Sequence, residues 1–78
     1  MKEKVESYLK KAKPLFEGLR KVEDNEKADR LYEMAMSYYK DAQHFYEKGE
    51  YIHALAALEY AEGWMDAGKE MGLLSCDS

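Results

Sequence analysis

The fold of this chain is decided by the stretch YIHALAALEYAEGWMDAGKEMG, residues 51–72. The stretch predicts a helix with small residues along one side and large apolar residues beside them. Small side chains let neighbouring backbones approach closely, and the larger ones fill the remaining volume. Because the apolar arc is so wide, we expect this helix to be the central one, covered by both neighbours. The small residues are Ala54, Ala57, Ala61, Gly68 and Gly72, flanked by Leu58, Trp64, Met65 and Met71.

Two amphipathic helices precede this stretch. Residues 2–22 and 25–48 carry apolar side chains at alternating steps of four and three, which is the spacing of a helix with one buried face. Pro14 removes a backbone hydrogen bond inside the first helix, but the apolar stripe keeps its phase across it. We therefore predict one helix kinked at Pro14. Gly49 ends the second helix, and the short connection that follows forces the second and third helices to run antiparallel.

The sequence thus predicts an all-α protein, an up-and-down three-helix bundle with helices near residues 2–22, 25–48 and 51–72. Residues 1–74 form this single domain, and residues 75–78 are expected to be a disordered tail. A chain of 78 residues buries a small core, so its stability should be marginal. Oligomerisation is one remaining route to stability.

Composition points to a cytoplasmic protein. Cys76 is the only cysteine, which is typical of a reducing compartment and excludes a disulfide within the chain. No apolar run approaches the roughly 20 residues that a membrane-spanning helix needs. We therefore expect no membrane contact.

Charge is spread unevenly along the chain. The net charge is −4, but residues 1–23 hold seven Lys or Arg against four Asp or Glu, and residues 24–78 hold five against twelve. Lysines between Lys2 and Lys13 predict a phosphate-binding face, which makes a nucleic-acid- or nucleotide-associated accessory domain the alternative function. Because the whole chain is acidic, we do not favour nucleic acid as a partner.

Two stretches resemble known families. The run YAEGWMDAG, residues 60–68, with Gly72-Leu73-Leu74 after it, resembles the signature of a small archaeal family catalogued as domain of unknown function three-five-seven. That resemblance implies an up-and-down three-helix bundle without an established activity. The segment 45–61 looks like a single tetratricopeptide-type helix pair. No second copy follows at the expected offset of about 34 residues, so we interpret this as hairpin packing common to both.

No constellation in the sequence predicts catalysis. Asp41-x-x-His44 and Glu50-x-x-His53 flank the turn and are similar to carboxylate–histidine pairs of metal-binding bundles. His44 falls outside the apolar stripe of its helix, so we expect no metal. An acidic ridge on the third helix is expected to be a solvated face, because a straight helix cannot wrap carboxylates around an ion. We therefore expect a non-enzymatic protein with no cofactor, no metal site and no catalytic residue. The ridge comprises Glu59, Glu62, Asp66 and Glu70.

The aromatic excess comes nearest to a function. Seven tyrosines, one tryptophan and five methionines exceed what a three-helix core easily encloses, and these residue types are enriched at protein interfaces. Ordinary bundle packing with hydroxyl groups at the rim is the alternative interpretation. We predict a protein–protein interaction or assembly module that binds an unknown protein partner or forms a homodimer. The candidate interface residues are Tyr32, Tyr39 and Tyr46, which repeat every seven positions, together with Trp64 and Asp66.

Overall fold

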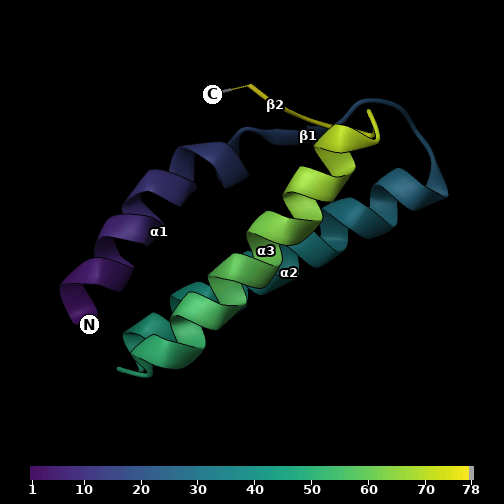
Figure 1. Ribbon diagram of the computed structural model, residues 1–78. Coiled ribbons are helices and arrows are strands. Elements are labelled where there is room, and N and C mark those ends of the chain that lie inside the picture. Colours follow the sequence, from purple (N-terminus) through teal and green to yellow (C-terminus); the bar gives the residue numbers. More distant parts are fainter. Residues whose placement is uncertain (78) are drawn as a thin grey trace.

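Three helices and two short strands make up the computed structural model, which describes residues 1–77. Figure 1 shows α1 and α3 running in the same direction along the bundle, while α2, behind α3 in this view, runs the other way. The predicted all-α, up-and-down three-helix bundle is therefore confirmed. The elements are α1 (Lys2–Glu17), β1 (Leu19–Lys21), α2 (Glu26–Glu47), α3 (Tyr51–Glu70) and β2 (Leu74–Cys76).

The α2–α3 hairpin is the most closely packed part of the bundle (Figure 1). Alanines dominate the buried contact, because their small side chains let the two helices lie close together. Gly49 makes the turn between them with a φ of 79°, which favours glycine. There the amide of Glu50 donates to the carbonyl of Phe45 at 2.9 Å and satisfies a carbonyl at the end of α2. The buried alanines are Ala28, Ala35 and Ala42 of α2 and Ala54, Ala57 and Ala61 of α3.

The α1 helix lies against this hairpin through one narrow stripe. Val5, Ala12 and Phe16 are its buried residues. The Phe16 ring stacks on the Tyr39 ring of α2, with 4.5 Å between ring centres and 5° between planes. An aromatic pair of this kind stabilises a contact beyond the area that it buries. The Phe16–Tyr39 stack therefore anchors α1.

The end of α1 differs from the prediction. The helix passes through Pro14 in one piece, as expected, but it ends at Glu17 and does not continue to residue 22. The Gly18 amide donates to the Pro14 carbonyl at 3.0 Å and closes the last turn. Leu19–Lys21 then become strand β1, because their backbone groups pair with β2 instead of with the preceding helical turn.

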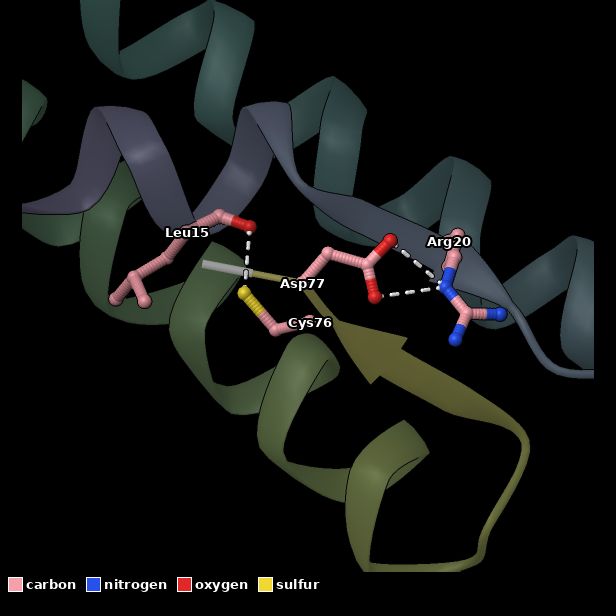
Figure 2. Close-up of polar contacts among 4 residues, drawn as sticks. All are labelled: Leu15, Arg20, Cys76 and Asp77. Atoms are coloured by element: carbon pink, nitrogen blue, oxygen red, sulfur yellow. Dashed lines mark hydrogen bonds and ion pairs between the residues drawn. The ribbon is translucent and has the colours of Figure 1, made fainter.

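Strands β1 and β2 form an antiparallel pair, here named the clasp, in which Arg20 lies opposite Ser75. Figure 2 shows the Arg20 Nε donating to both carboxylate oxygens of Asp77, at 2.9 Å each. In the same view, the Cys76 Sγ donates to the Leu15 carbonyl at 3.1 Å. The predicted disordered tail is therefore wrong for residues 75–77, since these contacts order it, and residue 78 lies outside the described residues.

Leu74 connects the clasp to the core. Its side chain is buried directly over Gly68 of α3, where a Cβ atom would lie 2.4 Å from the Leu74 Cδ1. Gly68 is thus small because another part of the chain occupies the space next to it. The α3 helix ends at Glu70, two residues before the predicted end, and Gly72 in the turn that follows has a φ of 72°.

Candidate interaction surface

The tyrosine column of α2 faces the N-terminal segment of the same chain. Tyr39 is only 5% exposed and stacks on Phe16. Tyr32 is half-buried, and the Lys21 ammonium group lies 5.7 Å from the centre of its ring. The prediction that these tyrosines form an outer contact with a partner is therefore wrong for Tyr39, which is part of the core.

Tyr46, the third member of the column, also faces α1. Its hydroxyl donates a hydrogen bond to the Glu6 carboxylate. That hydrogen bond is the largest cause that raises the pKa of Tyr46, to about 12. All three tyrosines therefore contact the N-terminal segment. Tyr32 lies next to Lys21, Tyr39 stacks on Phe16, and Tyr46 donates to Glu6.

Trp64 and Asp66, the other two candidates, lie on α3 and away from that column. Trp64 is half-buried and packs against the core at one edge. Asp66 is exposed and belongs to the acidic ridge. Burial raises the pKa of Glu62, and the neighbouring Asp66 and Glu59 carboxylates raise it further. The ridge therefore concentrates negative charge along one edge of α3.

Beside Trp64, α3 carries a bare surface that we name the open face. Tyr60 on this face is 62% exposed, and its ring stacks on Tyr38 of α2 with 5.3 Å between ring centres. The open face points away from α1. Its centre lies about 120° around α3 from Leu55 and Glu62, which line a groove between α1 and α3. It encloses a shallow hollow of about 480 Å³. The residues that line this hollow are Ala56, Glu59, Tyr60, Gly63, Trp64 and Ala67.

This surface corrects the expectation that both neighbouring helices cover the apolar arc of α3. The two helices cover only the half of the arc that contains Ala54, Ala61 and Met65. Ile52, at the start of the helix, is 71% exposed. The hollow on the rest of the arc is lined by α3 residues alone, so within residues 1–77 this part of α3 faces outward.

Gly63 is the most informative residue of the open face. A Cβ atom at this position would have nothing within 4 Å, whereas one at Gly68 would collide with Leu74. Glycine inside a helix costs about 1 kcal/mol relative to alanine. Packing within the described residues explains that cost at Gly68 but not at Gly63. A helix that is smooth at Gly63 is suited to the close approach of another backbone.

A second groove, of about 430 Å³, lies between α1 and α3. Lys4 and Lys11 line one side of it, and Glu59 and Glu62 line the other. Charges of both signs at its rim give it no preference for a ligand of one sign. The remaining α1 lysines are exposed among Glu3, Glu6 and Glu17, so they do not form a patch of a single charge.

The two histidines considered as metal ligands, His44 and His53, make separate contacts. His44 is exposed, and its Nδ1 lies 4.0 Å from the Glu47 carboxylate. The His53 ring packs against Phe45, with 5.4 Å between ring centres. Among residues 1–77, no three His, Cys, Asp or Glu side chains gather in a way that could hold a metal ion. None of the helices in this range is long and apolar enough to cross a membrane.

The sequence reasoning missed Tyr60, Gly63, Ala56 and Ala67. One signal could have found them. Gly63 lies about 180° around α3 from Ala54, which is well outside the small-residue stripe that meets α2. A glycine opposite the buried stripe has no partner in its own hairpin, so it indicates a second contact surface.

The fold and this surface define a small three-helix bundle in which α1 lies against the α2–α3 hairpin and one face of α3 is open. Residues 2–74 match the family model described as Protein of unknown function (DUF357), so the chain belongs to that family. Neither the curated proteins nor the solved structures include a significant match to the chain.

Proposed function

We propose that the protein is a non-enzymatic interaction module of the cytoplasm that binds a helix of a protein partner on its open face. The observation that carries this proposal is Gly63, whose missing side chain has no explanation within the described residues. The exposed Tyr60 beside it is an aromatic side chain of the kind that anchors protein interfaces.

The shape of the open face supports a helical partner. The 20 residues of α3 extend over about 30 Å, and the hollow follows them from Ala56 to Ala67. A helix laid along this surface would complete a four-helix arrangement, with α1 on one side of the hairpin and the partner on the other. Recognition of a helix in an apolar groove is a recurrent mode of protein binding.

Affinity capture from an extract of the native cell tests this proposal. The immobilised parent is compared with Tyr60→Glu and Gly63→Leu, which obstruct the open face. Ser7→Glu on the exposed side of α1 is the control, because it changes the net charge by the same amount as Tyr60→Glu. The expected result is a protein retained by the parent and the control but lost with both open-face variants. The retained protein, once identified and purified, should rebind with the same pattern.

Two outcomes would contradict the proposal. If the open-face variants retained the same proteins as the parent, the open face would not be a binding surface. If nuclease-sensitive RNA or DNA were retained instead, and Lys10→Glu and Lys13→Glu released it, the nucleic-acid alternative would take its place.

A further inference from the structure

We propose that the partner helix carries small residues along its contact seam and lysine or arginine along one flank. This inference rests on the proposed function and specifies the chemistry of the partner at the same surface.

The seam follows from the middle of the open face. Gly63 lies between Ala56 and Ala67, so the surface is lowest where two crossing helices come closest. The distance between packed helix axes depends on the side chains at the contact. Small residues on the partner therefore allow the closest approach, and Tyr60 and Trp64 flank that contact as aromatic anchors.

The basic flank follows from the edge of the same face. Glu59 borders the hollow, and Asp66 and Glu70 lie within about 40° of it around the helix. Burial is the first cause that raises the pKa of Glu62, and the charges of Asp66 and Glu59 raise it further, as expected for carboxylates on neighbouring turns of one helix. A lysine or arginine flank would meet this edge with opposite charge, and complementary charge favours both orientation and the rate of association.

A second copy of this chain fits the open face less well. In a homodimer formed through the open face, the two α3 helices would pack antiparallel, because their dipoles then oppose each other. A two-fold axis near Gly63 would place the same edge of each α3 helix side by side. Glu59 of one protomer would then lie near Asp66 of its partner, and like charges would face each other across the contact. The acidic edge likewise disfavours the anionic surface of a membrane.

A selection from a displayed helix library tests the chemistry without knowledge of the native partner. The library presents a single helix in which seam positions take Gly, Ala, Ser, Leu or Phe. Flank positions take Lys, Arg, Glu or Asp in equal proportion. The full-length protein is the bait, and Gly63→Leu is used for counter-selection. We expect the selected helices to be enriched in small residues at the seam and in Lys or Arg on one flank.

Affinity measurements on one selected helix then locate the contact. The double variant Glu59→Lys/Asp66→Lys should weaken binding at least tenfold, and added salt should weaken binding to the parent. The control Asp41→Lys/Glu47→Lys makes the same change of charge on exposed positions of α2 and should leave the affinity within twofold. Gly63→Ala should also weaken binding, although it places no atom against the rest of the chain.

Three results would overturn the inference. These are selected helices with acidic or mixed flanks, equal binding to the Glu59→Lys/Asp66→Lys variant, and a parent that forms a dimer through the open face at micromolar concentration. The proposed function is judged separately, because a native protein could depend on the open face while the selected helices show no basic flank. In that case the interaction module would stand and only the partner chemistry would fall.

Discussion

The two sides of the α2–α3 hairpin each carry an aromatic stack, but only one side is covered. On one side Tyr39 meets Phe16 of α1 and is buried, and on the other Tyr38 meets Tyr60, which remains exposed. The covered side contributes to the core. The bare side exposes apolar surface and carries Gly63, a helical glycine that no contact within the described residues explains. An aromatic stripe therefore has different meanings on the two sides, and it is the neighbouring element that decides between them.

Removal of the stacked ring on the covered side should have the largest effect. Phe16→Ala deletes a buried aromatic side chain and leaves a cavity, so we expect a loss of about 3–5 kcal/mol in the free energy of unfolding. Tyr60→Ala on the bare side is the matched control and should change it by less than about 1 kcal/mol. Chemical denaturation followed by circular dichroism measures both. Equal losses would mean that the two sides contribute equally to the core.

The two glycines of α3 sharpen the same comparison. Gly68→Ala places a methyl group where Leu74 already lies, so overpacking should cost about 1–3 kcal/mol and outweigh the gain in helix propensity. The double variant Gly68→Ala/Leu74→Ala should cost less than the sum of its two single changes, because the added methyl group then enters the vacated space. A double-mutant cycle of unfolding free energies tests this, and simple additivity would contradict the contact.

Gly63→Ala should act in the opposite direction. Its new methyl group meets nothing, and alanine favours the helix by about 1 kcal/mol, so the thermal midpoint should rise. The gain in stability separates this position from Gly68, although the two residues lie in the same helix. If the midpoint fell, an intramolecular role for Gly63 would replace its assignment to the open face.

The smallest expected effect concerns pH on the covered side. Tyrosine in an unfolded chain ionises near pH 10, and the hydrogen bond to Glu6 raises the pKa of Tyr46 in the fold to about 12. Neutral Tyr46 therefore contributes stability below pH 10, and this contribution is lost as the pH rises toward 12. Tyr46→Phe should flatten the decline of the unfolding free energy between these values. An unchanged decline would show that Tyr46 does not hold α1 in solution.

The sequence predicted the bundle because residues such as Leu31, Ala35 and Ala42 recur at helical spacing, and that spacing depends on local geometry alone. It misplaced the end of α1 because Leu19 and Val22 continue the same apolar rhythm. A short run of this kind fits a helix or a strand equally well, and the choice was made by a partner strand at the other end of the chain.

The candidate site was harder to predict for a related reason. Tyr39 and Tyr60 are chemically identical, and each lies at the border of an apolar stripe. Whether such a residue is buried depends on which groove of the hairpin receives α1, and no local spacing contains that information. Gly63 was the exception, because its angle around α3 already set it apart from the buried small residues.

The clasp has a consequence for the order of folding. Its ion pair joins residues separated by 57 positions, whereas the α2–α3 hairpin brings together residues that are close along the chain. Closing a long loop costs more entropy than closing a short one, so contacts that are local in sequence form faster. The hairpin should therefore form first and offer both of its grooves to the solvent for a time. During that interval the face of the hairpin that α1 covers is exposed to solvent. The clasp then joins the segment after α1 to the segment after α3, so it holds the end of α1 in place.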